Sequence, residues 1–295
     1  MGNHKFRKKL YTTIFGTYRA IAYALFSRLY PSMPKACETE SLDIIIPVTE
    51  KDLAILPLCL EGVRRCVSNK IHKIFIVGPE SEQIRSVCDH KKTIFIEECS
   101  VLGYSPRDLN IIAKSGKNRS GWIFQQLLKL SGKIGDQSHF LVIDSDHILL
   151  QPHTFITAEG KSVLYQSKEY YFPYYKNIEK LTGSFPYHCL SYISHKMVFN
   201  KSVLENLRNE LIHKNGSSGS TWDGIIIKSL DLSYDSSFSE FELYGNFMPG
   251  NKKIHYPWRQ LTLHRSKQLP SYESLCKQFG KDYLSVTFPD YLAEN

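Results

Sequence analysis

The sequence predicts an α/β protein with a mostly parallel sheet that is flanked by helices. The first observation is a set of short apolar runs that fit buried strands, at residues 42–48, 73–78, 93–97 and 139–144. The second is that helical patterns at residues 53–67 and 122–130 alternate with these runs, as in parallel sheets with both faces covered. The third is a length of 295 residues with 42% hydrophobic and 22% charged residues, which is ample for one large folded domain.

The individual segments support this order of elements. The first run is interrupted by Pro47, which favours a short strand. Leu56, Leu60 and Val63 recur at helical spacing in the segment that follows. The fourth apolar run ends at Asp144. Because ligands bind beyond the carboxyl ends of the strands in such sheets, we expect the functional site in the turn after this run.

The pattern changes after Pro152. Residues 165–192 are rich in tyrosine and phenylalanine, and we expect most of these rings to form core and lid packing. The alternative is that these rings line a binding groove. Residues 215–220 are composed of Asn, Gly and Ser, which predicts a flexible loop.

The basic charge is concentrated in an amino-terminal arm, so we divide the chain into an arm and linker (residues 1–38) and one domain (residues 39–295). Seven basic residues precede the first acidic one, Glu38, and account for +7 of the formal net charge of +8: Lys5, Arg7, Lys8, Lys9, Arg19, Arg28 and Lys35. The remaining chain is close to neutral. This distribution argues against a nucleic-acid partner, which would require a basic surface on the domain.

A helix is expected over residues 10–30, before Pro31 and Pro34. Arg19 would fall in the middle of a membrane span, which argues against a spanning helix. One face of the helix is apolar: Leu10, Ile14, Tyr18, Ile21, Leu25 and Leu29, widened by Phe15, Ala22 and Phe26. A basic amphipathic helix of this kind is typical of anionic membrane surfaces, and it predicts a cytoplasmic protein held peripherally on the inner face of the cell membrane. Packing against the domain and a signal anchor are the alternatives.

The cysteines fit a reducing compartment. There are seven, an odd number, and no two of them have the C-x-x-C spacing of a zinc or redox motif. We therefore expect free, mostly structural thiols.

Asp144 and Asp146 are the strongest candidates for chemistry. Two aspartates one residue apart, directly after a buried strand, suit a hard divalent cation that also binds a substrate diphosphate. Alone, the Asp-x-Asp pattern is also compatible with a solvated turn. A phosphatase or nuclease metal site, with Glu97 and Glu98 as further ligands, is another interpretation.

Several linked motifs resemble one family. They lie at residues 43–53, 119–130, 140–146, 192–199 and 238–246, in the expected order. Together they resemble a little-characterised bacterial family of GT-A-fold glycosyltransferases, in the nucleotide-diphospho-sugar transferase superfamily, that is linked to surface polysaccharide synthesis. The resemblance runs from about residue 42 to residue 265 and does not cover the arm.

This resemblance implies a GT-A-like, Rossmann-like sheet, a nucleotide-sugar donor, a glycan or lipid-linked acceptor and a Mn²⁺ or Mg²⁺ cofactor. It places Asp144, Asp146 and a late histidine, His264, on the metal, with His255 as the second choice of histidine. It implies contacts with the nucleotide sugar from Pro47, Val48, Thr49, Lys51, Asp52, Arg119, Trp122, Gln125, Asp144, Ser145 and His195. His195 is expected at the end of a short apolar strand.

Three carboxylates are candidates for the catalytic base that takes the acceptor proton. The first choice is Glu240, followed by Glu242, and Asp223 is the third. Ser237 and Ser239 each stand three residues before one of the two glutamates, so a helix capping box is the competing explanation for them.

The predicted function is therefore a metal-dependent glycosyltransferase. Two other classes remain as alternatives: a nucleotidyltransferase or metal-dependent phosphohydrolase, and a non-catalytic glycan-binding protein on the same fold. The segment after the first strand, residues 47–52, contains no glycine. This argues against a nucleotidyltransferase, which usually has a glycine-rich loop there.

Overall fold

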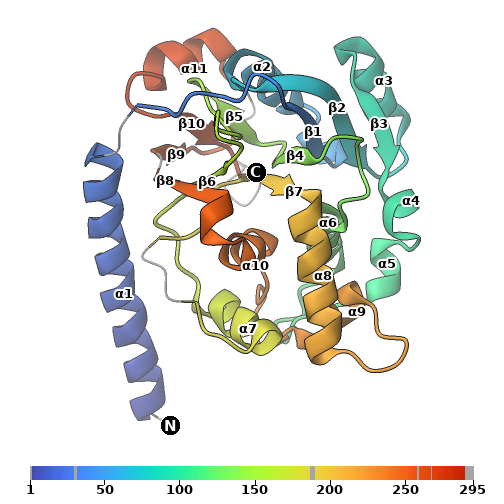
Figure 1. The fold of residues 1–295 in the computed structure, drawn as a ribbon, viewed down its shortest axis with the longest axis vertical. Helices are drawn as coiled ribbons and strands as arrows, with labels where there is room; N and C mark the ends of the chain where they lie inside the picture. Colours follow the sequence, from blue (N-terminus) through green and yellow to red (C-terminus); the bar gives the residue numbers. More distant parts are fainter. Residues whose placement is uncertain (1, 30–31, 187–189, 258, 267, 290–295) are drawn as a thin grey trace.

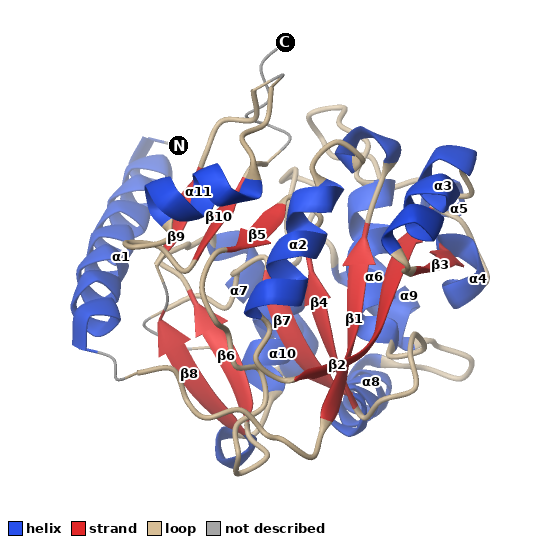
Figure 2. Cartoon of the chain, turned by 90° about the horizontal axis from the view of Figure 1, so that it is seen from above, coloured by secondary structure: helices blue, strands red, loops and turns tan. Residues whose placement is uncertain are grey.

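A computed structural model describes the chain except for residues 1, 30–31, 187–189, 258, 267 and 290–295. Its centre is a five-stranded sheet with the order β3-β2-β1-β4-β7 (Figures 1 and 2). The strands are β1 (Ser41–Pro47), β2 (Lys70–Gly78), β3 (Ile94–Glu97), β4 (His139–Ile143) and β7 (Lys196–Asn200). The β1–β2, β2–β3 and β1–β4 pairs are parallel, and only the β4–β7 pair is antiparallel.

Helices cover both faces of this sheet, which confirms the predicted α/β class. Helix α2 (Leu56–Cys66) lies on one side, while α6 (Ser120–Ser131), α8 (Lys201–Asn215) and α10 (Glu240–Phe247) lie on the other (Figures 1 and 2). The remaining helices of the domain are α3 (Glu82–Lys91), α4 (Glu98–Leu102), α5 (Pro106–Leu109), α7 (Phe172–Thr182), α9 (Trp222–Ser229) and α11 (Tyr272–Phe279). Short 3-10 turns, η1 (Glu50–Asp52) and η2 (Gly250–Lys252), complete the set.

Two smaller sheets bring the carboxy-terminal segment to the predicted site. One has the order β5-β10-β9, from β5 (His147–Leu149), β10 (Ser285–Thr287) and β9 (Gln260–Thr262). The other pairs β6 (Ser162–Gln166) with β8 (Lys253–Pro257) in parallel. Because β5 follows the Asp144 turn directly, its pairing with β10 fixes that turn, and the Phe288 amide donates to the Asp146 carbonyl at 3.0 Å.

Three rings of the aromatic segment belong to the core. Tyr165, Tyr175 and Tyr192 are almost fully buried, which confirms the packing interpretation for these three rings. A Cβ atom at Gly245 would lie 2.4 Å from the Tyr192 ring. Close packing of α10 on this ring therefore requires a glycine at position 245.

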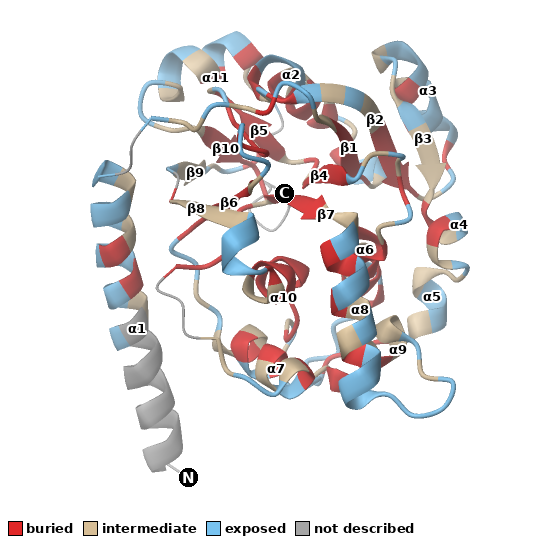
Figure 3. Cartoon of the chain, viewed as in Figure 1, coloured by how far each residue is buried: buried red, intermediate tan, exposed pale blue. Residues whose placement is uncertain are grey.

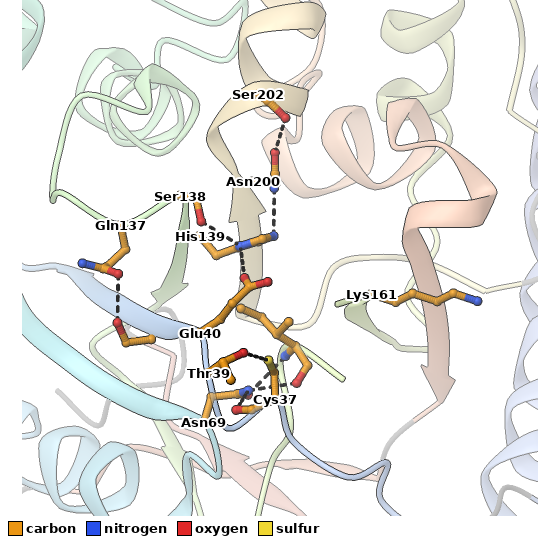
Figure 4. A network of polar contacts seen from close by, with 12 residues as sticks. Cys37, Thr39, Glu40, Asn69, Gln137, Ser138, His139, Lys161, Asn200 and Ser202 are labelled. Carbon is orange, nitrogen blue, oxygen red and sulfur yellow. Dashed lines mark hydrogen bonds and ion pairs between the residues drawn. The ribbon is translucent and has the colours of Figure 1, made fainter. Parts of the chain in front are cut away.

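A polar network fastens the sheet at the amino ends of its parallel strands (Figure 4). His139 at the start of β4 contacts the Glu40 carboxylate at 3.0 Å and Asn200 of β7 at 2.8 Å. The Asn69 side chain donates to the Ile156 carbonyl at 2.8 Å. These contacts join the amino ends of β1, β2 and β4 to the end of β7, and the Asp144 turn lies at the opposite, carboxyl edge of the sheet.

Helix α1 (Gly2–Leu29) stands beside the domain (Figures 1 and 3). Arg19, at 3% exposure, faces the domain, and its guanidinium donates to the Tyr175 hydroxyl at 2.9 Å. The predicted apolar face points away from the domain: Ile14, Tyr18, Ile21, Leu25 and Leu29 are 54–77% exposed. The side chains of Leu10 and Phe15 lie outside the described part. Among the described residues, no helix is both long enough and apolar enough to cross a membrane.

The described cysteines carry free thiols, in agreement with the prediction. Cys37, Cys59, Cys66 and Cys88 are buried, and Cys99 and Cys276 are partly buried. Cys189 lies outside the described residues.

Candidate functional site

The Asp144–Asp146 turn lies where the sequence predicts it, at the carboxyl end of β4. The Asp144 amide donates to the His195 carbonyl at 2.9 Å, and the His147 amide donates to the Asp144 carbonyl at 3.0 Å. Ser145, between the two aspartates, is buried. The turn is thus fixed from both sides before any ligand binds.

His195 completes a group of three metal-ligating side chains. One ligand atom each from Asp144, Asp146 and His195 lies within 4.8 Å of the others. His195 does not end a strand as predicted: it directly precedes β7, with φ at +57°. This left-handed backbone turns the chain sharply where it enters the antiparallel strand, and strain of this kind often marks functional sites.

The structure places His195, and not the predicted His264, in this group. His264 is exposed in the segment after β9 and does not belong to the cluster. His255, the second choice, makes its contact with the Tyr192 hydroxyl at 3.1 Å. A sequence gives no direct indication of which of several histidines reaches a given strand end, because the antiparallel pairing of β4 with β7 decides it here.

Lys129 of α6 joins the aspartate turn to Glu240. Its ammonium group lies 2.8 Å from an oxygen of Asp144 and 2.8 Å from an oxygen of Glu240. Lys129 and Glu240 are buried, whereas the Asp144 side chain is partly exposed. The Glu240 amide also donates to the Gln126 side chain at 3.1 Å. The predicted metal site and the first-choice base therefore share one buried cation.

The two aspartates differ in their electrostatic surroundings. Burial alone would raise the pKa of Asp144, but the charge of Lys129 and the hydrogen bond with His195 outweigh burial and hold that pKa below its usual range. Burial and the charge of Asp144 raise the pKa of Asp146 to about 6. Burial opposes a charge on His195, yet its hydrogen bond to Asp144 raises the pKa of the imidazole.

The donor set of this group fits a divalent cation. Two carboxylates supply hard oxygen ligands, and an imidazole supplies a nitrogen ligand. Carboxylates crowded in this way need a nearby cation, and here Lys129 and His195 provide part of the compensation. A metal ion would displace the proton of His195 and that of Asp146 where it is protonated.

The predicted nucleotide residues of the first loop form a second polar cluster. The Thr49 hydroxyl donates to Asp52 at 3.0 Å. Arg265 donates to the other Asp52 oxygen at 3.0 Å and to the Lys51 carbonyl at 2.6 Å. The negative charge of Asp52 acts on Asp146, so the loop lies near the metal candidates. Arg265 thus connects the carboxy-terminal segment to this loop.

Other predicted contacts of the nucleotide sugar are placed less favourably. Pro47 and Val48 are buried, and the Val48 side chain belongs to the hydrophobic core, so this side chain is not available to a ligand. Arg119 stacks on Trp122, with its guanidinium carbon 4.2 Å from the ring centre. Within the described part of the chain, no hydrogen bond or ion pair joins Arg119, Trp122 or Gln125 to the Asp144 turn.

Glu242 and Asp223 are engaged in structural contacts. Glu242 is buried and accepts hydrogen bonds from Tyr175 at 2.7 Å and from Ser191 at 2.6 Å. Asp223, on α9, accepts a hydrogen bond from the Tyr104 hydroxyl at 2.7 Å. The Ser239 hydroxyl accepts from the Glu242 amide, which is one half of the predicted capping box, while the Glu242 carboxylate bonds Tyr175 and Ser191 and does not return to Ser239. Of the three base candidates, only Glu240 contacts the group around Asp144.

Glu97 and Glu98 do not support the phosphatase or nuclease interpretation. Glu97 caps α4 by accepting from the amides of Cys99 and Ser100. Burial, followed by the charge of Glu97, raises the pKa of Glu98 to about 7. Neither glutamate belongs to the metal-ligating group found among the described residues.

Two charged residues near the turn were not predicted from sequence. Lys129 interrupts the apolar run Leu127-Leu128-Lys129-Leu130, and a lysine inside such a run indicates a buried, paired charge. Glu169 lies 3.9 Å from the outer ring nitrogen of His195. It has no comparable signal, because it stands in a polar loop between β6 and α7.

A family described as a family of unknown function, DUF6492, matches residues 39–275. The sequence matches no curated protein. Among solved structures, glucosyl-3-phosphoglycerate synthase from Mycobacterium tuberculosis, with Mn²⁺, UDP and glucosyl-3-phosphoglycerate, is similar at 13% identity and a TM-score of 0.37, over 74% of this chain and 69% of that one.

Two further solved structures show a similarly remote likeness. Mouse xyloside xylosyltransferase 1 has 12% identity and a TM-score of 0.42, over 86% of this chain and 100% of that chain. The galactosyltransferase LgtC, in complex with donor and acceptor sugar analogues, has 11% identity and a TM-score of 0.42, over 84% and 87%. These likenesses are remote, so the chemistry of the site is inferred from its own residues.

Proposed function

We propose that this chain, which belongs to the DUF6492 family of unknown function, is a metal-dependent glycosyltransferase with a GT-A-like fold that uses a nucleotide-sugar donor. The observation that carries the proposal is the group of Asp144, Asp146 and His195 at the carboxyl end of β4. Its position agrees with the general location of ligands in parallel α/β sheets. The resemblance of five ordered sequence motifs to bacterial GT-A glycosyltransferases supports the choice of substrate class.

Asp144, Asp146 and His195 would hold the cation, which offsets the negative charge that develops on the departing diphosphate. The mixed set of oxygen and nitrogen ligands favours Mn²⁺ over Mg²⁺. Lys129 keeps Asp144 ionised and oriented. Thr49, Lys51 and Asp52 form the loop beside the nucleotide, and Arg265 holds that loop in place.

Glu240 is the proposed catalytic base. A carboxylate can take the proton of an acceptor hydroxyl as that oxygen attacks the donor sugar. Glu240 and Asp144 contact the same lysine, Lys129, so Glu240 lies near the position where the donor would bind. Asp223 and Glu242 have structural partners, which makes them weaker candidates.

The acceptor that we propose is a glycan or a lipid-linked saccharide, in bacterial surface polysaccharide synthesis. The protein would be held on the inner face of the cell membrane by α1. Two features support this location: the basic charge of the arm and the outward-facing apolar residues of the helix.

Hydrolysis of nucleotide sugars in the absence of an acceptor tests the proposal. A panel of UDP, GDP, CMP and dTDP sugars is incubated with the protein at neutral pH, with Mn²⁺ or with EDTA. We expect slow, Mn²⁺-dependent hydrolysis of one donor, and about a 100-fold loss in Asp146→Asn. Asp89→Asn, which changes an exposed carboxylate on α3, is the control and should retain the wild-type rate.

A thermal-shift screen with the same donors gives a reading that does not depend on turnover. A donor at 100 times its Kd should stabilise the fold by about 2.7 kcal/mol, and only when Mn²⁺ is present. If no donor of the panel binds or is hydrolysed, the chain is not a nucleotide-sugar transferase. Turnover of nucleoside triphosphates instead would identify a nucleotidyltransferase.

A further inference from the structure

A hollow of about 400 Å³ lies between the end of α1 and the domain. It is outside the candidate site, on the side where α1 runs next to β8 and β9 (Figure 1). Its polar lining comes from segments that are far apart in sequence: Ser27, Arg28, Gln151, Arg259, Lys281 and Asp282. Because α1 supplies one wall, the hollow exists only while the helix is docked.

The walls of the hollow are fixed by the backbone. The Leu284 amide donates to the Arg259 carbonyl at 2.9 Å, and the Gln151 amide donates to the Leu284 carbonyl at 3.3 Å. The Gln151 side chain also donates to the Gly280 carbonyl. On the other wall, Tyr23 of α1 contacts the backbone of Gln260. The hollow is therefore a preformed feature of the fold.

The charge of the hollow is strongly positive. Arg28, Arg259 and Lys281 line it against a single acid, Asp282, and all four side chains are exposed. Within the described part of the chain, none of the three cations forms an ion pair with a carboxylate. Three cations that face one space repel each other, and an anion with several oxygens removes this repulsion while accepting their hydrogen bonds.

An exposed apolar stripe ends beside this hollow. Ile21, Leu25 and Leu29 are 56%, 55% and 77% exposed, and Arg28 lies within the same last turns of α1. Burial of large apolar side chains away from water is favourable, so this face is suited to a hydrocarbon partner. A lipid supplies both hydrocarbon and a phosphate, whereas a free phosphate makes no use of the stripe.

We propose that the hollow binds the phosphate of an anionic membrane lipid while the stripe of α1 lies in the membrane interface. The inference rests on the membrane association in the proposed function, and it goes further by assigning a headgroup site. It also gives the domain a defined orientation on the bilayer. Arg19 fixes one turn of α1 against Tyr170 and Tyr175, and a bound headgroup would fix the end of the helix at Arg259 and Lys281.

Vesicle binding by the full chain tests the headgroup site. The probes are phosphatidylcholine vesicles with and without phosphatidylglycerol. The hollow variant combines Arg259→Glu with Lys281→Glu. A control of equal charge combines Lys70→Glu on β2 with Arg107→Glu on α5, two exposed residues outside the lining of the hollow. We expect the hollow variant to bind anionic vesicles at least about tenfold more weakly, and the control to stay within about twofold of wild type.

The outcomes separate a specific site from general attraction. If both double variants lose affinity equally, the surface charge acts without a site and the inference is wrong. The inference is also wrong if the hollow binds free phosphate. In that case both variants bind vesicles equally, and inorganic phosphate raises the melting temperature of wild type but not that of the hollow variant. If the hollow variant does not melt cooperatively, Arg259→Gln with Lys281→Gln replaces it. Donor hydrolysis by wild type reports on the transferase separately.

Discussion

At the scale of single residues, the centre of the site is one ammonium group between two carboxylates. Lys129 contacts Asp144 and Glu240 at 2.8 Å each, and it is buried together with Glu240. A buried ion pair is weak evidence for stability as a whole, but removal of one partner leaves an uncompensated charge. Lys129 is therefore required for the ionised form of the site.

Lys129→Met should lower the free energy of unfolding by about 3–5 kcal/mol, because it leaves Asp144 and Glu240 without their common cation. Urea denaturation at neutral pH, in the presence of EDTA, measures this loss. Glu240→Gln, added to Lys129→Met, removes one of the two stranded charges and should recover a substantial part of it. A single variant within about 1 kcal/mol of wild type would show that water reaches Lys129 in solution.

Some residues of the site could be predicted from sequence, and others could not. Asp144 and Asp146 were identified because their signal is local: a buried strand followed by two aspartates. His195 was named as a substrate contact and His264 as the metal ligand. The choice between them depends on the antiparallel pairing of β4 with β7, a long-range contact that leaves no mark at either histidine.

At the scale of elements, strands and helices with a regular pattern of apolar residues are predicted well, and segments of mixed polarity are predicted poorly. The expected strand at residues 42–48 is β1, and the expected helix at residues 122–130 is α6. β2 begins at Lys70, earlier than expected, because its first residues are partly polar and partly exposed. The sequence places the strand before His195, whereas β7 follows it, because the residues before His195 form loop contacts such as the Ser167–Ser191 bridge.

The amphipathic character of α1 was recognised from sequence, but its orientation was not. Arg19, which is not part of the predicted apolar face, is buried, and the apolar residues face outward. The reason is a chain of polar contacts: Arg19 donates to Tyr175, and Tyr175 donates to the buried carboxylate of Glu242. A helical wheel separates two faces of a helix but does not say which face meets the domain.

Arg19→Met should release α1 from the domain. It removes a hydrogen bond to Tyr175 and the stacking of the guanidinium on Tyr170 and Tyr175, which together contribute about 2–4 kcal/mol. Hydrogen exchange of the α1 amides should accelerate at least about tenfold. Arg107→Met, at an exposed position on α5, is the control. Equal exchange in wild type and Arg19→Met would mean that Arg19 does not hold the helix.

At the scale of the whole molecule, the buried ionisable groups oppose one another as the pH falls. Burial lowers the pKa of His147 and of His153 well below the usual value, so these rings are neutral in the fold and protonate on unfolding. Acid therefore destabilises the fold through them. Asp146 and Glu98 have raised pKa values of about 6 and about 7, mainly from burial, and they act in the opposite direction.

A variant of His153 isolates one of these contributions. His153 packs beside the rings of Phe155 and Tyr165, and its Nδ1 atom lies 2.7 Å from the Gln151 carbonyl oxygen. Its unfolded pKa is about 6.5, so its stabilisation is complete above that pH and is lost below it. Between about pH 7.5 and about pH 5.5, wild type should lose about 1.4 kcal/mol more than His153→Gln, measured by urea denaturation with EDTA. Parallel stability profiles for the two proteins would show that His153 already binds its proton in the folded state.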